Sequence, residues 1–241
     1  MKLSIIFLVA LVLILLYMVV QFMGSSKTDL TKVINDATLP ITISAKDLPS
    51  GSTASNYAYS IWFYINDWNV NYGTEKILFT RKDTNNNVSP SVVLGAFENN
   101  LDITVAVYPD QNTQANSDGS MPTHTCSVEN IPIQKWVNLI ISLNGRSLDV
   151  YLDGKLVRTC ALPGVAMINK EADIYLTPTP TGGFDGFTSK FQYIPEPVNP
   201  QEAYNIYKAG YGGGGLAGSM DRYKVKVSYL VDNKEKSTYE L

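Results

Sequence analysis

The sequence predicts an all-β fold, a two-sheet antiparallel jelly-roll sandwich, with a transmembrane helix before it and one short helix after it. About eleven short strand-like runs separated by turn residues are typical of such a sandwich. Residues 3–22 carry no charge, and residues 199–210 hold the start and stop signals of a single helix. The chain of 241 residues is 45% hydrophobic, which is enough to form a core.

The uncharged run at residues 3–22 predicts a membrane anchor. About 20 apolar residues at a rise of 1.5 Å each cover the ~30 Å hydrocarbon core of a bilayer. The alternative is a cleaved signal peptide, whose apolar region is usually only about 7–15 residues long. We therefore expect residues 1–26 to be retained as a single-pass anchor in the lipid bilayer. The side chains expected in the bilayer include Leu3, Ile6, Leu8, Leu11, Ile14, Leu16, Val19 and Phe22.

After the anchor, residues 27–38 are expected to form a polar connector, and residues 39–210 to form the sandwich. Within the sandwich, residues 57–65 are apolar and aromatic on both faces, as expected of a strand in the middle of a sheet. Residues 109–122 form a long polar loop, which is either a solvated crossing between sheets or a binding loop on a rigid scaffold.

Residues 136–160 carry the clearest strand pattern of the chain. The dipeptides Asn144-Gly145 and Asp153-Gly154 divide this stretch into three runs. Both dipeptides tolerate the positive φ of a tight hairpin turn. Apolar and polar residues alternate over 148–152, so this strand is expected to have one buried face. Three antiparallel strands of this kind need a larger sheet to join.

The predicted helix has a signal at each end. Asn199 is a good N-cap, Pro200 suits the first helical position, and Glu202 can complete a capping box. Gly210 is expected to end the helix.

A tail, residues 211–241, is expected to follow as a Gly-rich hinge and a C-terminal strand. Residues 221–231 alternate in polarity and predict a lone strand. A lone strand is not stable, so it must pair with its own domain or with a neighbouring protein, and we expect a neighbour. The residues of this possible partner strand are Tyr223, Val225, Val227 and Tyr229.

Charge and the rarer residue types exclude several kinds of site. The net charge of −3 and the lack of a basic patch argue against nucleic-acid binding. His124, the only histidine, follows a polar loop and has no nucleophile motif around it. One histidine and two cysteines cannot build a structural zinc site of the usual spacing.

Cys126 and Cys160 are candidates for a disulfide. Cys126 precedes the strand that starts at Trp136, and Cys160 ends the third strand of the central meander. A disulfide is geometrically possible if the strand that carries Cys126 lies beside that end. The alternative is two buried thiols. A disulfide would suggest an oxidising compartment.

Four motifs resemble the laminin-G/concanavalin A-like superfamily over about residues 39–210. They are Tyr59-Ser-Ile-Trp-Phe-Tyr64, Lys135-Trp136-Val-Asn-Leu, Leu148-Asp-Val-Tyr-Leu-Asp-Gly-Lys155 and Gly183-Phe-Asp-Gly186. The resemblance implies a concanavalin A-like jelly roll but says little about function. Some laminin-G-like domains bind Ca²⁺ through an aspartate and loop carbonyls, which makes Asp185 or the 110–118 loop a weak candidate metal site. We expect no other cofactor.

Relatives with this fold also include glycoside hydrolases, which place two or three carboxylates along one strand. The local candidates here are Glu171 with Asp173, and Asp149 with Asp153. The first pair lacks the third carboxylate of the family's arrangement, and Asp153 belongs to a turn. We therefore expect no catalytic residues and no enzymatic activity.

The combination of an anchor, one such domain and a Gly-rich tail also resembles small virion proteins of large icosahedral DNA viruses with an internal membrane. It implies a non-enzymatic minor capsid protein that links the membrane to neighbouring capsid or membrane proteins of the shell. The alternative is a cell-surface lectin or adhesin, in which loops that contain Trp68 or Tyr72 hold a glycan. The third hypothesis is a glycoside hydrolase.

Overall fold

The chain divides into two compact units, residues 27–211 and a unit made of residues 1–26 and 212–241. The computed structural model describes Leu11, Leu13, Tyr17, residues 28–31, 34–49, 56–85, 87–110, 114–117, 119–178 and 183–212, and the backbone of residues 226–231 and 234–240.

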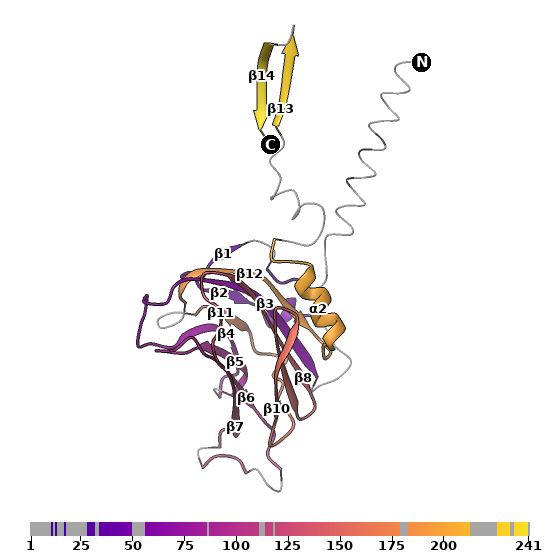
Figure 1. The fold of residues 1–241 in the computed structure, drawn as a ribbon. Coiled ribbons are helices and arrows are strands. Elements are labelled where there is room, and N and C mark those ends of the chain that lie inside the picture. Colours follow the sequence, from indigo (N-terminus) through magenta and orange to yellow (C-terminus); the bar gives the residue numbers. More distant parts are fainter. Residues whose placement is uncertain are drawn as a thin grey trace. The chain divides into compact units, whose positions relative to one another are not determined.

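Residues 27–211, here called the sandwich unit, form two six-stranded antiparallel sheets (Figure 1). Sheet A runs in the order β1 (Asn35–Asp36), β12 (Asp185–Ile194), β3 (Tyr57–Asp67), β8 (Trp136–Asn144), β9 (Ser147–Leu152) and β10 (Lys155–Ala161). Sheet B runs in the order β2 (Ile41–Ile43), β11 (Ile174–Leu176), β4 (Lys76–Lys82), β5 (Val88–Leu94), β6 (Leu101–Ala106) and β7 (Thr123–Val128). A single turn of 3₁₀ helix (Ala45–Asp47) follows β2. The predicted two-sheet antiparallel sandwich is confirmed.

Strand β3 is buried on both faces because a different layer covers each one. Ile61 and Phe63 pack into the main core between the sheets. On the outer face of sheet A, Ala58 belongs to a second apolar cluster, which helix α2 (Pro200–Lys208) completes (Figure 1). The buried members of that cluster are Ala58, Ile140, Tyr151, Val198 and Ala203. The helix therefore explains why the sequence of β3 is apolar on both sides.

The short helix α2 begins and ends as its sequence predicts. The side chain of Asn199 accepts a hydrogen bond from the backbone N–H of Glu202 (3.0 Å), and Glu202 Oε2 accepts one from the N–H of Asn199 (2.9 Å). Gly210 follows the helix with a φ of +73°, a conformation that costs glycine little.

Cys126 and Cys160 form a disulfide with their Cα atoms 6.1 Å apart. Cys126 lies on β7 and Cys160 on β10, which are the edge strands of sheets B and A. The bond therefore joins the two sheets covalently along one side of the sandwich.

Both ends of the sandwich unit are held by β12. At the entrance, the N–H of Leu30 donates to the carbonyl of Phe191 (2.8 Å), and β1 pairs with the start of β12. At the exit, Ser189 Oγ donates to the carbonyl of Tyr211 (2.7 Å), and the Tyr211 ring stacks on Trp136 with centroids 4.4 Å apart. Within the predicted connector at 27–38, Asn35–Asp36 therefore form an edge strand of sheet A, and Asp29 forms an isolated bridge with Gln192.

The C-terminal backbone also corrects a prediction. Strand β13 (Lys226–Val231) is not alone, because β14 (Lys234–Glu240) pairs with it as an antiparallel two-stranded sheet. The sequence of β14, Lys-Glu-Lys-Ser-Thr-Tyr-Glu, is rich in charge and carries no apolar alternation that would reveal a strand. Backbone pairing with β13 stabilises it instead.

Several predicted residues fall outside the described part of the chain. Of the possible partner strand, Val227 and Tyr229 lie in β13, whereas Tyr223 and Val225 are not described. Of the predicted anchor, Leu11 is described and helical. The anchor residues outside the description are Leu3, Ile6, Leu8, Ile14, Leu16, Val19 and Phe22. Within the described residues, no helix combines the length and the apolar character needed to cross a bilayer.

Candidate functional site

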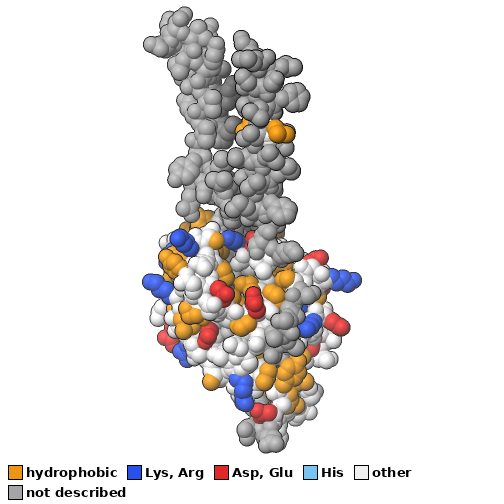
Figure 2. Space-filling model, turned by 90° about the vertical axis from the view of Figure 1, so that its right-hand side faces the viewer, with side chains coloured by type: hydrophobic (Ala, Val, Ile, Leu, Met, Phe, Trp, Pro, Cys, Tyr) orange, Lys and Arg blue, Asp and Glu red, His pale blue; other side chains and the backbone are white. Residues whose placement is uncertain are grey.

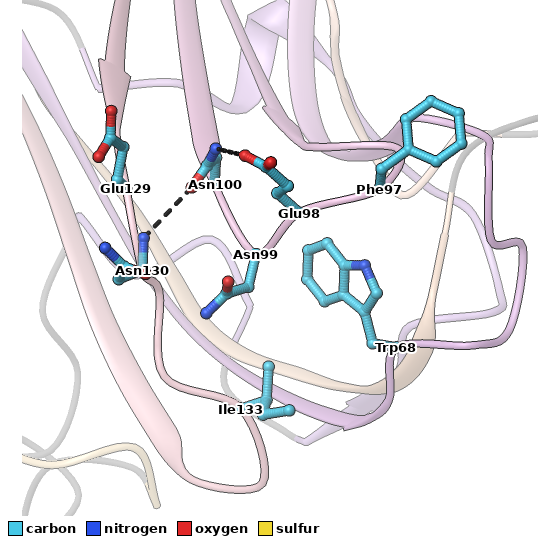
Figure 3. Close-up of a pocket in the computed structure, with 8 residues that line it drawn as sticks. All are labelled: Trp68, Phe97, Glu98, Asn99, Asn100, Glu129, Asn130 and Ile133. Carbon is cyan, nitrogen blue, oxygen red and sulfur yellow. Dashed lines mark hydrogen bonds between the residues drawn. The ribbon is translucent and has the colours of Figure 1, made fainter.

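Three loops at one end of the sandwich enclose a pocket of about 680 Å³, here called the Trp68 pocket (Figure 3). The loops are residues 68–75 between β3 and β4, 95–100 between β5 and β6, and 129–135 between β7 and β8. The pocket is lined by Trp68, Phe97, Glu98, Asn99, Asn100, Glu129, Asn130 and Ile133.

Hydrogen bonds join the middle loop to both of its neighbours. The N–H of Gly73 donates to the carbonyl of Ala96 (2.9 Å). On the other side, the N–H of Ile131 donates to the carbonyl of Asn99 (2.7 Å), and Asn99 Nδ2 donates to the carbonyl of Ile131 (2.9 Å). The walls of the pocket are therefore preformed, which lowers the entropy cost of binding a ligand.

The loops turn sharply at residues that tolerate unusual backbone geometry. Asn71 and Asn130 have φ values of +58° and +59°, in the left-handed region that asparagine visits more readily than most residues. Gly95 has no room for a side chain, because a Cβ atom there would lie 2.6 Å from the carbonyl oxygen of Glu98. These residues fix the shape of the pocket.

Trp68 is held in place by the main core and by Lys76. Its half-buried side chain packs against the main core, and the ammonium of Lys76 lies 4.7 Å from the centroid of its ring. Lys76 is fully buried and donates to the carbonyls of Asn71 (3.3 Å) and Thr74 (3.4 Å). Burial lowers the pKa of Lys76. The indole N–H of Trp68 is itself buried and has no acceptor among the described residues.

Apolar side chains extend the pocket to its rim. Tyr72 and Phe97 are 60% and 64% exposed, and their rings meet edge to face with centroids 5.6 Å apart. Ile133 is also exposed and faces the pocket beside Trp68 (Figure 3). Large apolar groups exposed together on a surface are typical of binding sites.

The opposite wall is polar (Figure 3). Glu98 Oε2 accepts a hydrogen bond from Asn100 Nδ2 (2.9 Å), and Asn100 Oδ1 accepts one from the N–H of Asn130 (3.3 Å). The carboxylate of Glu129 has no hydrogen-bond partner among the described residues. The lining thus combines aromatic and aliphatic groups with carboxylate and amide groups. This arrangement suits a ligand that has an apolar face and several hydroxyl groups.

The sequence analysis predicted the aromatic residues of this pocket and missed its carboxylates. Trp68, named in the lectin hypothesis, lines the pocket, and Tyr72 packs against Phe97 at its rim. Glu98 and Glu129 were missed because each lies in a polar turn of ordinary composition. They line the pocket only because three loops that are distant in sequence come together there.

The carboxylates proposed for hydrolysis lie elsewhere. Glu171 and Asp173 line a smaller hollow of about 310 Å³, here called the Glu171 hollow. Among the described residues, its lining is Lys82, Asp83, Thr84, Asn169, Glu171, Ala172, Asp173 and Tyr175. Asp173 Oδ1 accepts a hydrogen bond from the N–H of Ala45 (2.8 Å), so this carboxylate holds a neighbouring segment in place.

Asp149 and Asp153, the other pair, line neither of these two hollows. Asp149 accepts a hydrogen bond from Thr159 Oγ1 (2.7 Å) across to β10. Asp153 forms an ion pair with Lys135 (2.8 Å) and also accepts from the N–H of Asn138 (3.0 Å). Both carboxylates therefore have structural partners.

The candidate metal residues do not gather into a cluster. Asp185 Oδ2 accepts a hydrogen bond from Asn66 Nδ2 (2.9 Å). In the 110–118 loop, Asp110 lies 3.5 Å from Arg146, and residues 111–113 and 118 are outside the description. Over the residues that are described, no three Asp, Glu, His or Cys side chains come close enough to hold a metal ion.

Solved structures share the fold of the chain at low identity. The binding domain of botulinum neurotoxin serotype G is similar with a TM-score of 0.53 and 13% identity, over 76% of this chain and 51% of that one. The receptor binding domain of botulinum neurotoxin D gives a TM-score of 0.54 and 11% identity, over 75% and 46%. The chain thus spans about half the length of these neighbours. At such identity they show the fold alone.

The family is shown by the sequence itself. No curated protein sequence matches the chain. The model of a protein family described as the concanavalin A-like lectin/glucanases superfamily matches residues 37–202, more than half of the chain. This match confirms the resemblance drawn from the four motifs. The chain therefore belongs to the concanavalin A-like lectin/glucanases superfamily.

Proposed function

We propose that this protein is a non-enzymatic carbohydrate-binding protein whose ligand occupies the Trp68 pocket. The observation that carries the proposal is the make-up of that pocket, whose lining combines the Trp68 ring with Glu98 and Glu129 (Figure 3). Sugar rings have an apolar face that packs on an aromatic ring, and their hydroxyl groups donate to carboxylates.

The family and its structural neighbours agree with a binding role. The family includes lectins as well as glucanases. The neurotoxin domains named above are described as binding and receptor binding domains. In the Glu171 hollow, the Asp83 and Asp173 carboxylates are already hydrogen-bonded to backbone N–H groups, which leaves the Glu171 carboxylate beside Tyr175. Of the three functions considered from the sequence, binding of a glycan is therefore the best supported.

We also propose that the domain is presented at a membrane surface. The support is the uncharged run at residues 3–22, which is long enough for one span. The Cys126–Cys160 disulfide favours an oxidising compartment, such as a cell surface. Nothing in the comparisons supports the minor capsid role, which stays a prediction from the arrangement of the sequence.

A glycan array tests the proposal. The full-length chain is applied to immobilised neutral and acidic oligosaccharides, together with its Trp68→Ala and Tyr175→Ala variants. Tyr175 lines the Glu171 hollow and serves as the control. We expect binding that Trp68→Ala removes and Tyr175→Ala preserves. Turnover of a polysaccharide that disappears with Glu171→Gln would instead make the protein a hydrolase.

A further inference from the structure

We propose that the Trp68 pocket selects uncharged glycans and rejects those that carry carboxylate or sulfate groups. This inference rests on the proposed function and specifies the class of ligand. It follows from the charges that line the pocket and from the position of the nearest cations.

The pocket has charges of one sign only. Glu98 and Glu129 are acidic, and the described residues that line the pocket include no Lys, Arg or His. Asp67, at the end of β3, and Asp185, at the start of β12, add carboxylates at the same end of sheet A, where they pair in register. A ligand in the pocket therefore meets a negative electrostatic potential.

Two cations close to the pocket, Lys76 and Lys135, have partners of their own. Lys76 lies against Trp68, is fully buried, and donates to the carbonyls of Asn71 and Thr74. Lys135, the last residue of the third loop of the pocket, forms an ion pair with Asp153 (2.8 Å). Neither lysine is among the residues that line the pocket, although Lys76 keeps its positive charge, since its carbonyl partners are neutral.

This negative character is local. On the face of the molecule shown in Figure 2, basic and acidic side chains are interspersed over the sandwich, and no continuous patch of one sign forms there. The whole chain carries a net charge of only −3. Rejection of anions would therefore come from the carboxylates in and near the pocket, chiefly Glu98 and Glu129, and not from the overall charge of the protein.

The two kinds of ligand differ in what these carboxylates do to them. A sugar hydroxyl donates a charge-assisted hydrogen bond to a carboxylate, which is stronger than one between neutral groups. A sialic acid carboxylate or a sulfate group would instead face two like charges without a cation to pair with. We expect anionic forms of a bound glycan to bind at least tenfold more weakly than the uncharged parent.

The test uses matched pairs of glycans on the full-length chain. Lactose and N-acetyllactosamine, together with neutral mannose- and glucose-ended oligosaccharides, are compared with their sialylated or sulfated forms by biolayer interferometry. We expect a neutral member to bind, its anionic form to bind at least tenfold more weakly, and the difference to shrink in 1 M NaCl, where the Debye length is about 3 Å.

Two variants assign the selectivity to the pocket. In the double variant Glu98→Gln with Glu129→Gln, the gap between neutral and anionic glycans should close to less than threefold. Glu196→Gln, an exposed carboxylate on the segment between β12 and α2, is the matched control and should leave the gap unchanged. Thermal unfolding of each variant shows whether it is folded.

The outcomes separate this inference from the proposed function. Trp68-dependent binding that prefers the anionic member of a pair would overturn the selectivity and leave the glycan-binding function in place. A gap that persists in the Glu98→Gln, Glu129→Gln variant would also overturn it. Absence of binding to every glycan, neutral or anionic, would overturn the proposed function and the inference together.

Discussion

The Trp68 pocket and the Glu171 hollow differ in which of their polar groups are already used by the fold. In the Trp68 pocket, the indole N–H of Trp68 and the carboxylate of Glu129 have no partner among the described residues. In the Glu171 hollow, two of the three carboxylates among the described lining residues are used: Asp83 accepts from N–H groups of its own turn, and Asp173 accepts from the N–H of Ala45. A set of carboxylates in a hollow is therefore not enough to make a site, because a group that stabilises a loop is not available to a ligand.

Asp83 shows how many hydrogen bonds a carboxylate that stabilises a loop can accept. Its carboxylate accepts hydrogen bonds from the N–H of Asn85 (2.9 Å), the N–H of Asn87 (2.9 Å) and Asn87 Nδ2 (3.1 Å). Burial raises the pKa of Asp83, but the hydrogen bonds from Asn87, Asn85 and Asn169 outweigh it and hold the pKa below its ordinary value. The charged form of Asp83 is thus part of the turn between β4 and β5.

The largest expected effect is on the stability of the fold and not on ligand binding in either hollow. Replacing both Cys126 and Cys160 by serine removes a link that closes 34 residues of chain. Loop-closure entropy then predicts a loss of about 2–4 kcal/mol of unfolding free energy. Urea denaturation measures this loss. Glycan affinity below the unfolding transition should not change, because neither cysteine lines the Trp68 pocket. Loss of affinity in the folded double variant would mean that the pocket depends on the link between the sheets.

The next effect tests directly the difference between the Trp68 pocket and the Glu171 hollow. Trp68→Ala removes the aromatic wall of one pocket, and Tyr175→Ala removes the ring from the other. A central aromatic residue of a binding site contributes about 2 kcal/mol, so we expect roughly thirtyfold weaker glycan binding for Trp68→Ala. Titration calorimetry should show no change for Tyr175→Ala. Equal losses in both variants would remove the distinction between the two hollows.

A third prediction concerns pH. Because the pKa of Asp83 is depressed in the folded protein, its contribution to stability is present above the unfolded pKa of about 3.9 and is lost as the pH falls through the folded pKa. Asp83→Asn should therefore lower the unfolding free energy by about 1–2 kcal/mol at neutral pH, and the difference should shrink below about pH 4. Denaturation curves at several pH values check this. A constant difference across that range would show that the charge of Asp83 is not what stabilises the turn.

Local signals in the sequence predicted much of the fold. The capping residues of α2 and the turns that separate β8, β9 and β10 depend on neighbours within a few positions, and such signals are readable. Strands β1 and β14 were missed because their backbones become strands only by pairing with β12 and β13. Propensity carries no information about a partner that is distant in sequence or weakly patterned.

The candidate site was predictable to a smaller extent for the same reason. Trp68 and Tyr72 stand out as aromatic residues in a polar turn, so the sequence could name them. Glu98 and Glu129 belong to loops from other strand pairs, and only the register of sheet B brings these loops together at one end. Glu171 and Asp173, one of the two carboxylate pairs weighed for catalysis, are close along the chain and line the same hollow, but Asp173 is hydrogen-bonded to the N–H of Ala45.

The smallest predicted effect tests whether the Trp68 pocket is preformed. Asn99→Ala removes the hydrogen bond from Asn99 Nδ2 to the carbonyl of Ile131 (2.9 Å), which is one of the links between the second and third loops. The backbone bond between the same two residues remains. We therefore expect a modest loss of about 1 kcal/mol or less, or up to fivefold in glycan affinity.

Asn116→Ala is the matched control for this variant. Asn116 Nδ2 also donates a loop hydrogen bond, to Ser120 Oγ (2.9 Å), but it lies between β6 and β7, at the end of sheet B away from the pocket. If pre-organisation matters, Asn99→Ala should weaken binding mainly through faster dissociation, and Asn116→Ala should have no effect. Equal affinities for both variants and the unchanged chain would show that the ligand can order the loops itself. The pocket would then differ from the Glu171 hollow in chemistry but not in rigidity.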